Sequence, residues 1–280
     1  MNDSIFDKSR EVSTLLRLKI LFGGSIIQVL YGVFSFLMIF VLLFVANADF
    51  SDFTLANSPT TKGNITNITQ TNSRINKRYV FAFDYTFLVN DKIYKNKSFS
   101  TEKTSTNEVI IEYLAINPRN SRIKDMRQKT FPIYVALIGI FPIIILLILF
   151  FGIKKNLKAI SLMQTGELGY ATLIRTETTN VRVNNRYVVR LFYEFEDKNG
   201  NKIVFSTKTH QPEKITDETR EVLFYDVKNP KINVLKDSLA IKIALKENGK
   251  FKSPSFFEVL LLLILPFITV LMIFVALFSL

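Results

Sequence analysis

The side chains that most often carry catalysis are scarce in this chain of 280 residues. There is no cysteine, which excludes thiolate nucleophiles, disulfides, cysteine-ligated zinc and iron–sulfur clusters. His210 is the only histidine, and we interpret it as a loop residue because it lies among threonine, lysine and glutamine. One imidazole cannot build a histidine-rich metal site within one chain, and no Gly-x-Ser-x-Gly elbow accompanies it.

Carboxylates and glycines give no stronger signal for a reaction. Glu194, Glu196 and Asp197 cluster at the end of a predicted strand, and we interpret them as a solvated face. Acidic residues are too scattered for a Ca²⁺ or Mg²⁺ loop, and Gly166 and Gly169 form no phosphate-binding loop. We therefore assign no catalytic, cofactor-binding or metal-binding residue, identify no small-molecule substrate, and predict that the chain is not an enzyme.

The composition points to a membrane. Hydrophobic residues make up 48% of the chain, although its net charge is +12. Phe, Leu, Ile and Val gather in three blocks, while Lys and Arg lie almost wholly outside them. A bilayer demands this segregation. Because no basic run is interleaved with aromatic residues, we do not expect nucleic-acid binding and assign the charge to orientation and to anionic lipid headgroups.

Each of the three blocks is long enough to cross a hydrocarbon core of roughly 30 Å as a helix, which takes about 20 residues. We place the spans at 26–46, 131–153 and 256–280, with an earlier start of the first at Ile20 as an alternative. Ala46-Asn47-Ala48 resembles a signal-peptidase site. The apolar stretch before it is longer than the about 7–15 residues of a signal peptide, so we expect an uncleaved anchor.

Basic residues at the ends of the blocks predict the orientation. With the N-terminus inside, more Lys and Arg lie on the inner side than on the outer side, although the cluster before Phe131 opposes this choice. We predict a multi-pass protein of the inner (cytoplasmic) membrane whose N-terminal segment, 1–25, is cytoplasmic. The residues counted inside are Lys8, Arg10, Arg17, Lys19, Lys154, Lys155, Lys158, Lys242, Lys246, Lys250 and Lys252, and those outside are Arg119, Arg122, Lys124, Arg127 and Lys129.

The two segments between the blocks, 47–130 and 154–255, are too long to be connectors and resemble each other. Residues 76–87 and 184–195 both begin Asn-x-Arg-Tyr-Val and then carry apolar residues at every second position. A period of two with aromatic and β-branched residues predicts a half-buried strand.

The correspondence continues beyond this strand, and it includes a hairpin turn, a returning strand and an Asn-Pro pair that ends a strand. We therefore predict two duplicated copies of a small antiparallel β domain, sandwich-like or barrel-like. The matched pairs are 63–66 with 169–172, Asn90-Asp91 with 197–200, 99–101 with 205–207, 111–113 with 223–225, and Asn117-Pro118 with Asn229-Pro230.

Several runs carry a family resemblance, namely 179–195, 197–200, 223–230, 111–123, 21–23 and 165–172. They resemble the bacterial membrane-protein family known as domain of unknown function 3592, and the resemblance covers nearly the whole chain. It implies small β domains tethered to a bacterial inner membrane. It implies no known activity and no catalytic residues.

Together these patterns predict a membrane α+β protein in which three transmembrane helices alternate with two β domains. We predict that the β domains bind or scaffold an envelope partner, because exposed strand edges recruit extended segments. The alternative is an accessory subunit of a membrane transport or channel complex, although no charge lies at mid-depth in the spans. Gly23, Gly24 and Gly32 would permit close helix packing. The predicted partners are the lipid bilayer and an unidentified protein.

Overall fold

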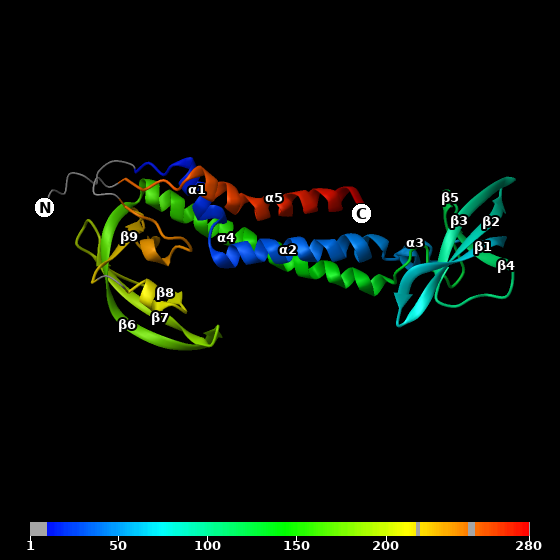
Figure 1. Ribbon diagram of the computed structural model, residues 1–280, viewed down its shortest axis with the longest axis horizontal. Coiled ribbons are helices and arrows are strands. Elements are labelled where there is room, and N and C mark those ends of the chain that lie inside the picture. Colours follow the sequence, from blue (N-terminus) through cyan, green and yellow to red (C-terminus); the bar gives the residue numbers. More distant parts are fainter. Residues whose placement is uncertain (1–9, 217–218, 246–249, 280) are drawn as a thin grey trace. The chain divides into compact units, whose positions relative to one another are not determined.

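The structure is a computed structural model that describes residues 10–216, 219–245 and 250–279 (Figure 1). Lys8 and Lys246, which we counted for the orientation, lie outside the described residues. The chain divides into two compact units. Unit A comprises 1–35 and 145–271, and unit B comprises 36–144 and 272–280. Each unit contains one β domain together with one end of each of the three long helices.

Among the described residues, three helices are long and apolar enough to cross a membrane, as predicted. Large apolar side chains on them are exposed, for example Ile26 at 64%, Phe141 at 60% and Phe267 at 70%. Water would disfavour this much exposed apolar surface, whereas lipid covers it without cost. The candidate spans are Ser25–Asn47, Ile133–Thr165 and Phe256–Phe278, with mean hydropathies of 2.7, 3.1 and 3.1. They contain α2 (Ser25–Phe44), the 3₁₀ helices η2 (Val45–Asn47) and η3 (Ile133–Gly139), α4 (Ile140–Thr165) and α5 (Phe256–Ser279).

The first span begins at Ser25 because a glycine pair separates it from the preceding helix, α1 (Thr14–Phe22). Gly24 has a φ of +95°, which side chains other than hydrogen disfavour. A Cβ at Gly24 would lie 2.8 Å from the Cβ of Ala240. The earlier start at Ile20 is therefore wrong, and the glycine pair permits a sharp turn and a close approach of the loop 236–244.

The second apolar helix, α4, continues to Thr165, twelve residues beyond its predicted end at residue 153. The segment 154–165, which we assigned to the second β domain, is therefore helical. Lysines mark the end of the apolar run, but the helix goes on as an amphipathic segment whose apolar side faces α1. Asn156 Nδ2 in this segment donates to the backbone oxygen of Ile20 at 2.8 Å. The shared core contains Val12, Leu16, Ile20, Ile160, Leu162, Met163, Phe224, Ile243 and Phe251.

The first β domain, in unit B, is a five-stranded antiparallel sheet with the order β3-β2-β1-β4-β5. Phe83, Tyr85 and Phe87 alternate along β2 and are buried together with Ile111 and Ile123. This is the half-buried strand predicted from the period of two. The strands are β1 (Thr60–Ile75), β2 (Arg78–Val89), β3 (Lys92–Ser100), β4 (Glu108–Leu114) and β5 (Asn117–Ile123).

The second β domain, in unit A, is a five-stranded antiparallel sheet with the order β10-β9-β6-β7-β8. Leu191, Tyr193 and Phe195 of β7 form its core with Leu223 of β9. Strand β6 is strongly bent (Figure 1), since its first residues pair with β9 and its later residues pair with β7. The strands are β6 (Glu167–Val183), β7 (Arg186–Glu196), β8 (Lys202–Thr209), β9 (Glu221–Tyr225) and β10 (Asn233–Leu235).

The predicted hairpin turns at Asn90-Asp91 and at 197–200 are confirmed. Two asparagines that we expected at the start of strands lie in turns, because Asn76 has a φ of +48° and Asn184 a φ of +50°. Asparagine tolerates this left-handed conformation better than most residues. Each of these residues thus opens the tight turn before β2 or β7.

The returning strands align differently from the sequence match. Phe99 pairs with Ala82, but the counterpart of Ala82, Arg190, pairs with Lys208 and not with Phe205. The second hairpin is one residue longer than the first, because 197–201 lie between Glu196 and Lys202 whereas 89–92 lie between the equivalent pair Leu88 and Ile93. The sequence match instead made the second hairpin two residues shorter, so the two alignments differ by three residues. A difference of three also reverses which face of the sheet a side chain occupies.

The predicted match and the observed pairing differ in two further places, at the ends of the matched segments. The match of 63–66 with 169–172 is displaced by two residues in the pairing with the fourth strand of each sheet. The Asn-Pro pairs come after β4 and β9, as expected, but the sequence analysis did not place the fifth strands: Asn117-Pro118 begins β5, and Asn229-Pro230 precedes β10. Pro118 lies near the start of the edge strand β5, a position that tolerates proline.

We predict that Gly24→Ala destabilises the protein, because the new Cβ requires a disfavoured φ and collides with Ala240. The expected loss is about 1–2 kcal/mol, seen as a lower midpoint of thermal unfolding in detergent. Gly32→Ala is the matched control, since the nearest atom to its new Cβ is 4.0 Å away. Equal midpoints for the two variants would contradict this account of the helix break.

Candidate functional site

Polar side chains close the first β domain between its two edge strands, β3 and β5. Asn96 Nδ2 donates to the backbone oxygens of Arg119 and Ser121, at 2.7 and 3.2 Å. The Oγ of Ser98 accepts a hydrogen bond from the backbone N–H of Ile123 at 2.9 Å. The sheet is therefore curled until its edges meet, and the barrel-like alternative describes this domain.

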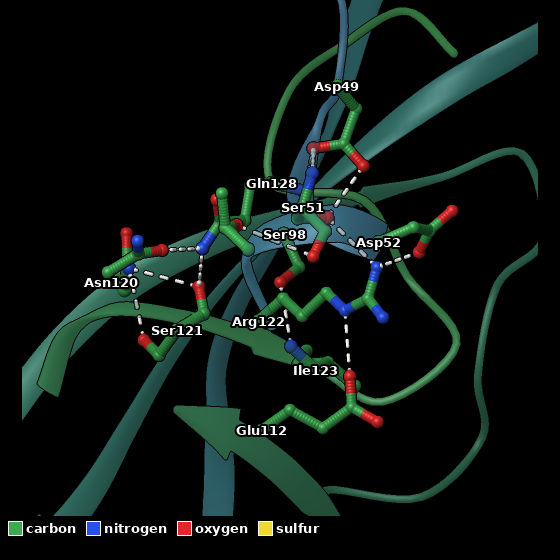
Figure 2. Close-up of polar contacts among 12 residues, drawn as sticks. Asp49, Ser51, Asp52, Ser98, Glu112, Asn120, Ser121, Arg122, Ile123 and Gln128 are labelled. Atoms are coloured by element: carbon green, nitrogen blue, oxygen red, sulfur yellow. Dashed lines mark hydrogen bonds and ion pairs between the residues drawn. The ribbon is translucent and has the colours of Figure 1, made fainter. Parts of the chain in front are cut away.

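Arg122 joins the closed edge to the short helix α3 (Ser51–Thr54), as Figure 2 shows. Its Nε donates to Glu112 Oε2 at 2.7 Å, and its Nη1 donates to Ser51 Oγ at 2.9 Å and to Asp52. Burial acts to lower the pKa of Arg122, but hydrogen bonds and the charges of Asp52 and Glu112 together raise that pKa above its ordinary value. The guanidinium stays charged, and its contacts are made within the domain.

Asp49, which follows the first candidate span by two residues, extends this network (Figure 2). Its carboxylate accepts hydrogen bonds from Ser51 Oγ at 2.7 Å and from the backbone N–H of Gln128 at 3.1 Å. Its own backbone N–H donates to the oxygen of Phe131 at 2.7 Å. The polar groups around Asp49 and Arg122 therefore hold the fold together through contacts within the first β domain.

The two β domains share details beyond their strand order. Each first strand has two irregularities of register against the second, at equivalent positions. The guanidinium of Arg74 lies 4.1 Å from the ring centre of Tyr79, and Arg182 stands at the same distance from Tyr187. These shared details allow the domains to be compared residue by residue.

This comparison shows an open edge in the second β domain. The pairing register makes Thr207 the counterpart of Ser98 and Leu235 the counterpart of Ile123. Among the described residues these two counterparts share no hydrogen bond. In their place lies a cavity of about 630 Å³, which is lined by the end of β8, the loop 236–244, the first turn of α2 and one residue of α4.

A longer connection explains why the second domain stays open. Residues 210–220 join β8 to β9, whereas 101–107 join β3 to β4. The longer connection inserts Ile215 into the core, where it is 5% exposed. The hydroxyl of Tyr193 donates to the backbone oxygen of Ile215 at 3.4 Å, whereas its counterpart Tyr85 contacts Ser121 Oγ at 2.9 Å. Ile215 therefore stands where the first domain brings its edges together.

Positive charge dominates the wall of this space, which we call the basic cavity. Among the described residues, five lysines and one carboxylate, that of Asp237, line it, and together these groups have a formal charge of +4. Lys236 Nζ lies 3.4 Å from Asp237 Oδ2. Within the described residues the other four lysines form no ion pair. All of the lining belongs to unit A. The five lysines are Lys155, Lys208, Lys214, Lys236 and Lys242.

Backbone and hydroxyl donors add to this positive wall. Ser25, Ile26 and Ile27 form the first turn of α2, whose N–H groups have no partner within a helix and favour negative charge. Gly24 precedes them and lets Ala240 approach closely, so the loop 236–244 is held against the start of the span. The cavity thus combines an apolar helix start with a basic rim.

The residues weighed for chemistry in the sequence lie in different places. His210 lies in the loop that follows β8, as expected, and it lines the basic cavity. Asp197 is 9% exposed, and its carboxylate accepts hydrogen bonds from the N–H groups of Asn199 and Asn201, both at 2.8 Å. Hydrogen bonds from Asn201 are the main reason that its pKa is lowered. Asp197 therefore shapes the hairpin turn, and in the described residues no acidic or histidine cluster could hold a metal ion.

Sequence reasoning missed the basic cavity because its lysines come from four separate parts of the chain. Lys155 was counted for orientation, Lys242 likewise, and Lys208 was read only as a neighbour of His210. The alignment of the two halves did contain one signal, because the connection between β8 and β9 is longer than the connection between β3 and β4. Only the pairing register shows that this extra length lies beside the lysines.

No model of a known protein family matches the chain, and no curated protein is significantly similar to it. The resemblance to domain of unknown function 3592 therefore remains a prediction that rests on the residues quoted for it. The comparisons assign no activity to the basic cavity.

We predict that Arg122→Gln loosens the first β domain, because Glu112 and Ser51 lose their charged partner at a site where the Arg122 side chain is only 12% exposed. The expected loss is about 2–3 kcal/mol, the range for losing hydrogen bonds to a charged group. Hydrogen exchange followed by mass spectrometry should show faster exchange in β5 in detergent. Arg119→Gln, an exposed neighbour on the same strand, is the control. The same exchange rate in both variants would refute a closing role for Arg122.

Proposed function

We propose that this chain is a membrane-anchored, non-catalytic binding protein whose basic cavity binds an anionic group. The observation that carries the proposal is a space of about 630 Å³ whose wall bears five lysines and one carboxylate. Ligand sites in proteins span roughly 300–1,000 Å³ and place a few polar groups around the ligand. The size and charge of the cavity fit a small anion with an organic portion.

Electrostatics explains why the ligand should be an anion. Lysines that line one concave wall repel one another, and a concave wall also concentrates their potential. Phosphate offers two negative charges and several acceptor oxygens, so it would relieve this repulsion and accept hydrogen bonds from the ammonium groups. A cation or a neutral apolar molecule would leave the lysine charges uncompensated.

The wall supports binding better than catalysis. A nucleophile needs a base beside it, and acid–base chemistry needs paired groups that face the substrate. Of the lining residues that the structure describes, Asp237 is the only carboxylate and lies beside Lys236, and His210 is the only imidazole. These contacts favour a site that holds an anion over one that transforms it.

The spans support an anchoring role over the alternative of a transport or channel subunit. In unit A the polar groups of the helices bond to one another. Ser35 Oγ lies 3.3 Å from Thr269 Oγ1, and Gln28 Nε2 donates to the backbone oxygen of Leu262 at 2.9 Å. Such contacts satisfy polar groups between helices and do not supply a lining for ions.

We further propose an inner bacterial membrane with unit A on its cytoplasmic side. In support, the described basic residues that we counted inside, among them Arg17, Lys154 and Lys252, all belong to unit A. Lys19 in the same unit forms an ion pair with Glu258 at the start of α5, at 2.6 Å. Equal strand orders and equal irregularities also support the duplication of one β domain, in line with the family resemblance. The first domain would then face envelope partners.

The proposed orientation predicts the outcome of reporter fusions. An enzyme that is active only outside the cytoplasm should be active after Thr61 and after the last residue, and inactive after Lys214. The reason is that each span reverses the side on which the chain continues. A reporter that is active only inside serves as the control and should give the opposite pattern. The same signal after Thr61 and Lys214 would contradict three crossings.

Anion binding predicts a rise in thermal stability. Diphosphate at about 100 times its Kd should stabilise the detergent-solubilised protein by about 2.7 kcal/mol, which corresponds to roughly 5 °C or more in Tm. The double variant Lys208→Gln and Lys242→Gln should lose most of this rise. Lys231→Gln, which changes an exposed lysine outside the cavity, should keep it. Failure of diphosphate to raise Tm, or an equal rise in the double variant, would refute the proposal.

A further inference from the structure

We propose that the natural occupant of the basic cavity is the phosphate-bearing headgroup of a membrane lipid, which reaches the cavity along α2. This inference rests on the proposed function and identifies the source of the anion. The chemistry is that of a lipid whose headgroup carries more than one negative charge, such as a phosphomonoester or a diphosphate.

The position of the cavity carries the first step. Gly24, Ser25, Ile26 and Ile27 line it, and the first membrane span begins at Ser25. Headgroups occupy the interfacial layer at the ends of the roughly 30 Å hydrocarbon core. Lys155 also lines the cavity and follows the apolar run of α4 by two residues. Two independent span ends therefore place the cavity at headgroup depth.

A continuous apolar path leads from the cavity into the span. Ile26 lines the cavity and is 64% exposed, and Val29 and Val33 are 63% and 42% exposed. Their spacing of three and four residues puts them on one face of α2. An acyl chain lying on this face would contact all three side chains while its headgroup sits among the lysines. A soluble anion would make no use of this path.

The charge balance sets the class of headgroup. The described part of the wall bears five lysines and Asp237, which gives it a formal charge of +4. A phosphodiester with one negative charge would compensate a quarter of it, and a zwitterionic headgroup none. Phosphomonoesters and diphosphates carry about two or more charges near neutral pH, since the second pKa of a phosphomonoester is about 6. They also offer more acceptor oxygens to the ammonium groups.

The first domain provides an internal comparison. At the equivalent place its edge strands are joined by Asn96 and Ser98, and Phe99 exchanges backbone hydrogen bonds with Arg127 at 2.8 and 3.0 Å. In the second domain the counterpart of Phe99 is Lys208, which lines the cavity. The first sheet therefore uses its own polar groups to join its two edges. The second sheet, which has the same strand order, has lysine side chains at the equivalent place.

The test uses the full-length protein in nanodiscs of phosphatidylcholine that contain a minority of either phosphatidic acid or phosphatidylglycerol. Native mass spectrometry counts the lipids that remain bound after release, and diphosphate is added as a soluble competitor. We expect phosphatidic acid to be retained over phosphatidylglycerol and to suppress the rise in Tm that diphosphate produces. The double variant Lys208→Gln and Lys242→Gln should bind phosphatidic acid roughly tenfold or more weakly, while Lys231→Gln binds as the parent does.

A second variant separates the lipid path from the anion site. Ile26→Glu places a negative charge where the path meets the cavity, so it should weaken retention of phosphatidic acid more than Val181→Glu, a matched change at an exposed site on β6. Diphosphate binding without retained lipid would overturn the lipid inference and leave the proposed function standing. If neither diphosphate nor phosphatidic acid binds, both proposals fall. Thermal unfolding of each variant shows whether it is folded.

Discussion

The structure depends first on the need to cover three helices whose outward side chains are apolar. In α2, α4 and α5 many Ile, Val, Leu and Phe side chains are exposed, and the protein itself buries only a small part of these helices. Each such residue contributes about −0.3 to −0.6 kcal/mol toward insertion at the centre of a bilayer. The bilayer therefore supplies the apolar surroundings that the chain does not, and it fixes where each helix can begin and end.

The helices also shape the second β domain, because its sheet packs directly on them. Phe224 on β9 is fully buried against α1 and the amphipathic end of α4, so one face of the sheet packs on the helices. The other face encloses its own core around Tyr193 and Leu223. A sheet with both faces covered has little freedom to curl, and Ile215 fills part of the space that curling would close. The basic cavity follows from these two packing requirements, and its lysines occupy the edge that remains open.

Much of the fold could be predicted from the sequence because its signals are local. Period-two aromatics predicted β2 and β7, and Asn90-Asp91 predicted a hairpin. Apolar runs predicted the three spans. The end of α4 could not be predicted in the same way, since its lysines resemble the end of a span while Met163 meets a partner on α1 only after folding. The apolar periodicity of the short segment 154–165 becomes clear only when the surface of α1 that it packs against is known.

The candidate site could not be predicted from the sequence because strand pairing brings its residues together. Lys155 lies in α4 and Lys208 lies in β8, far apart in the sequence. Their proximity depends on the register of β8. Phe99 and Phe205 stand in similar sequences, but the two hairpin turns differ in length. Lys208, not Phe205, therefore takes the pairing position of Phe99. A register error of three residues moves each side chain to the opposite face. Sites built across strands therefore require the pairing itself to be known.

The contact between Gly24 and Ala240 gives the bilayer a mechanical connection to the cavity. Ala240 of the loop 236–244 lies directly against Gly24 at the start of α2, and Gln28 and Lys19 bond to α5 from the same region. Helices in thicker or thinner bilayers change their tilt. A change in the tilt of α2 would carry the loop with it and alter the spacing of Lys236 and Lys242 from Lys208. If the cavity binds a headgroup as proposed, the thickness of the surrounding lipid would change its affinity for that headgroup through the tilt of α2.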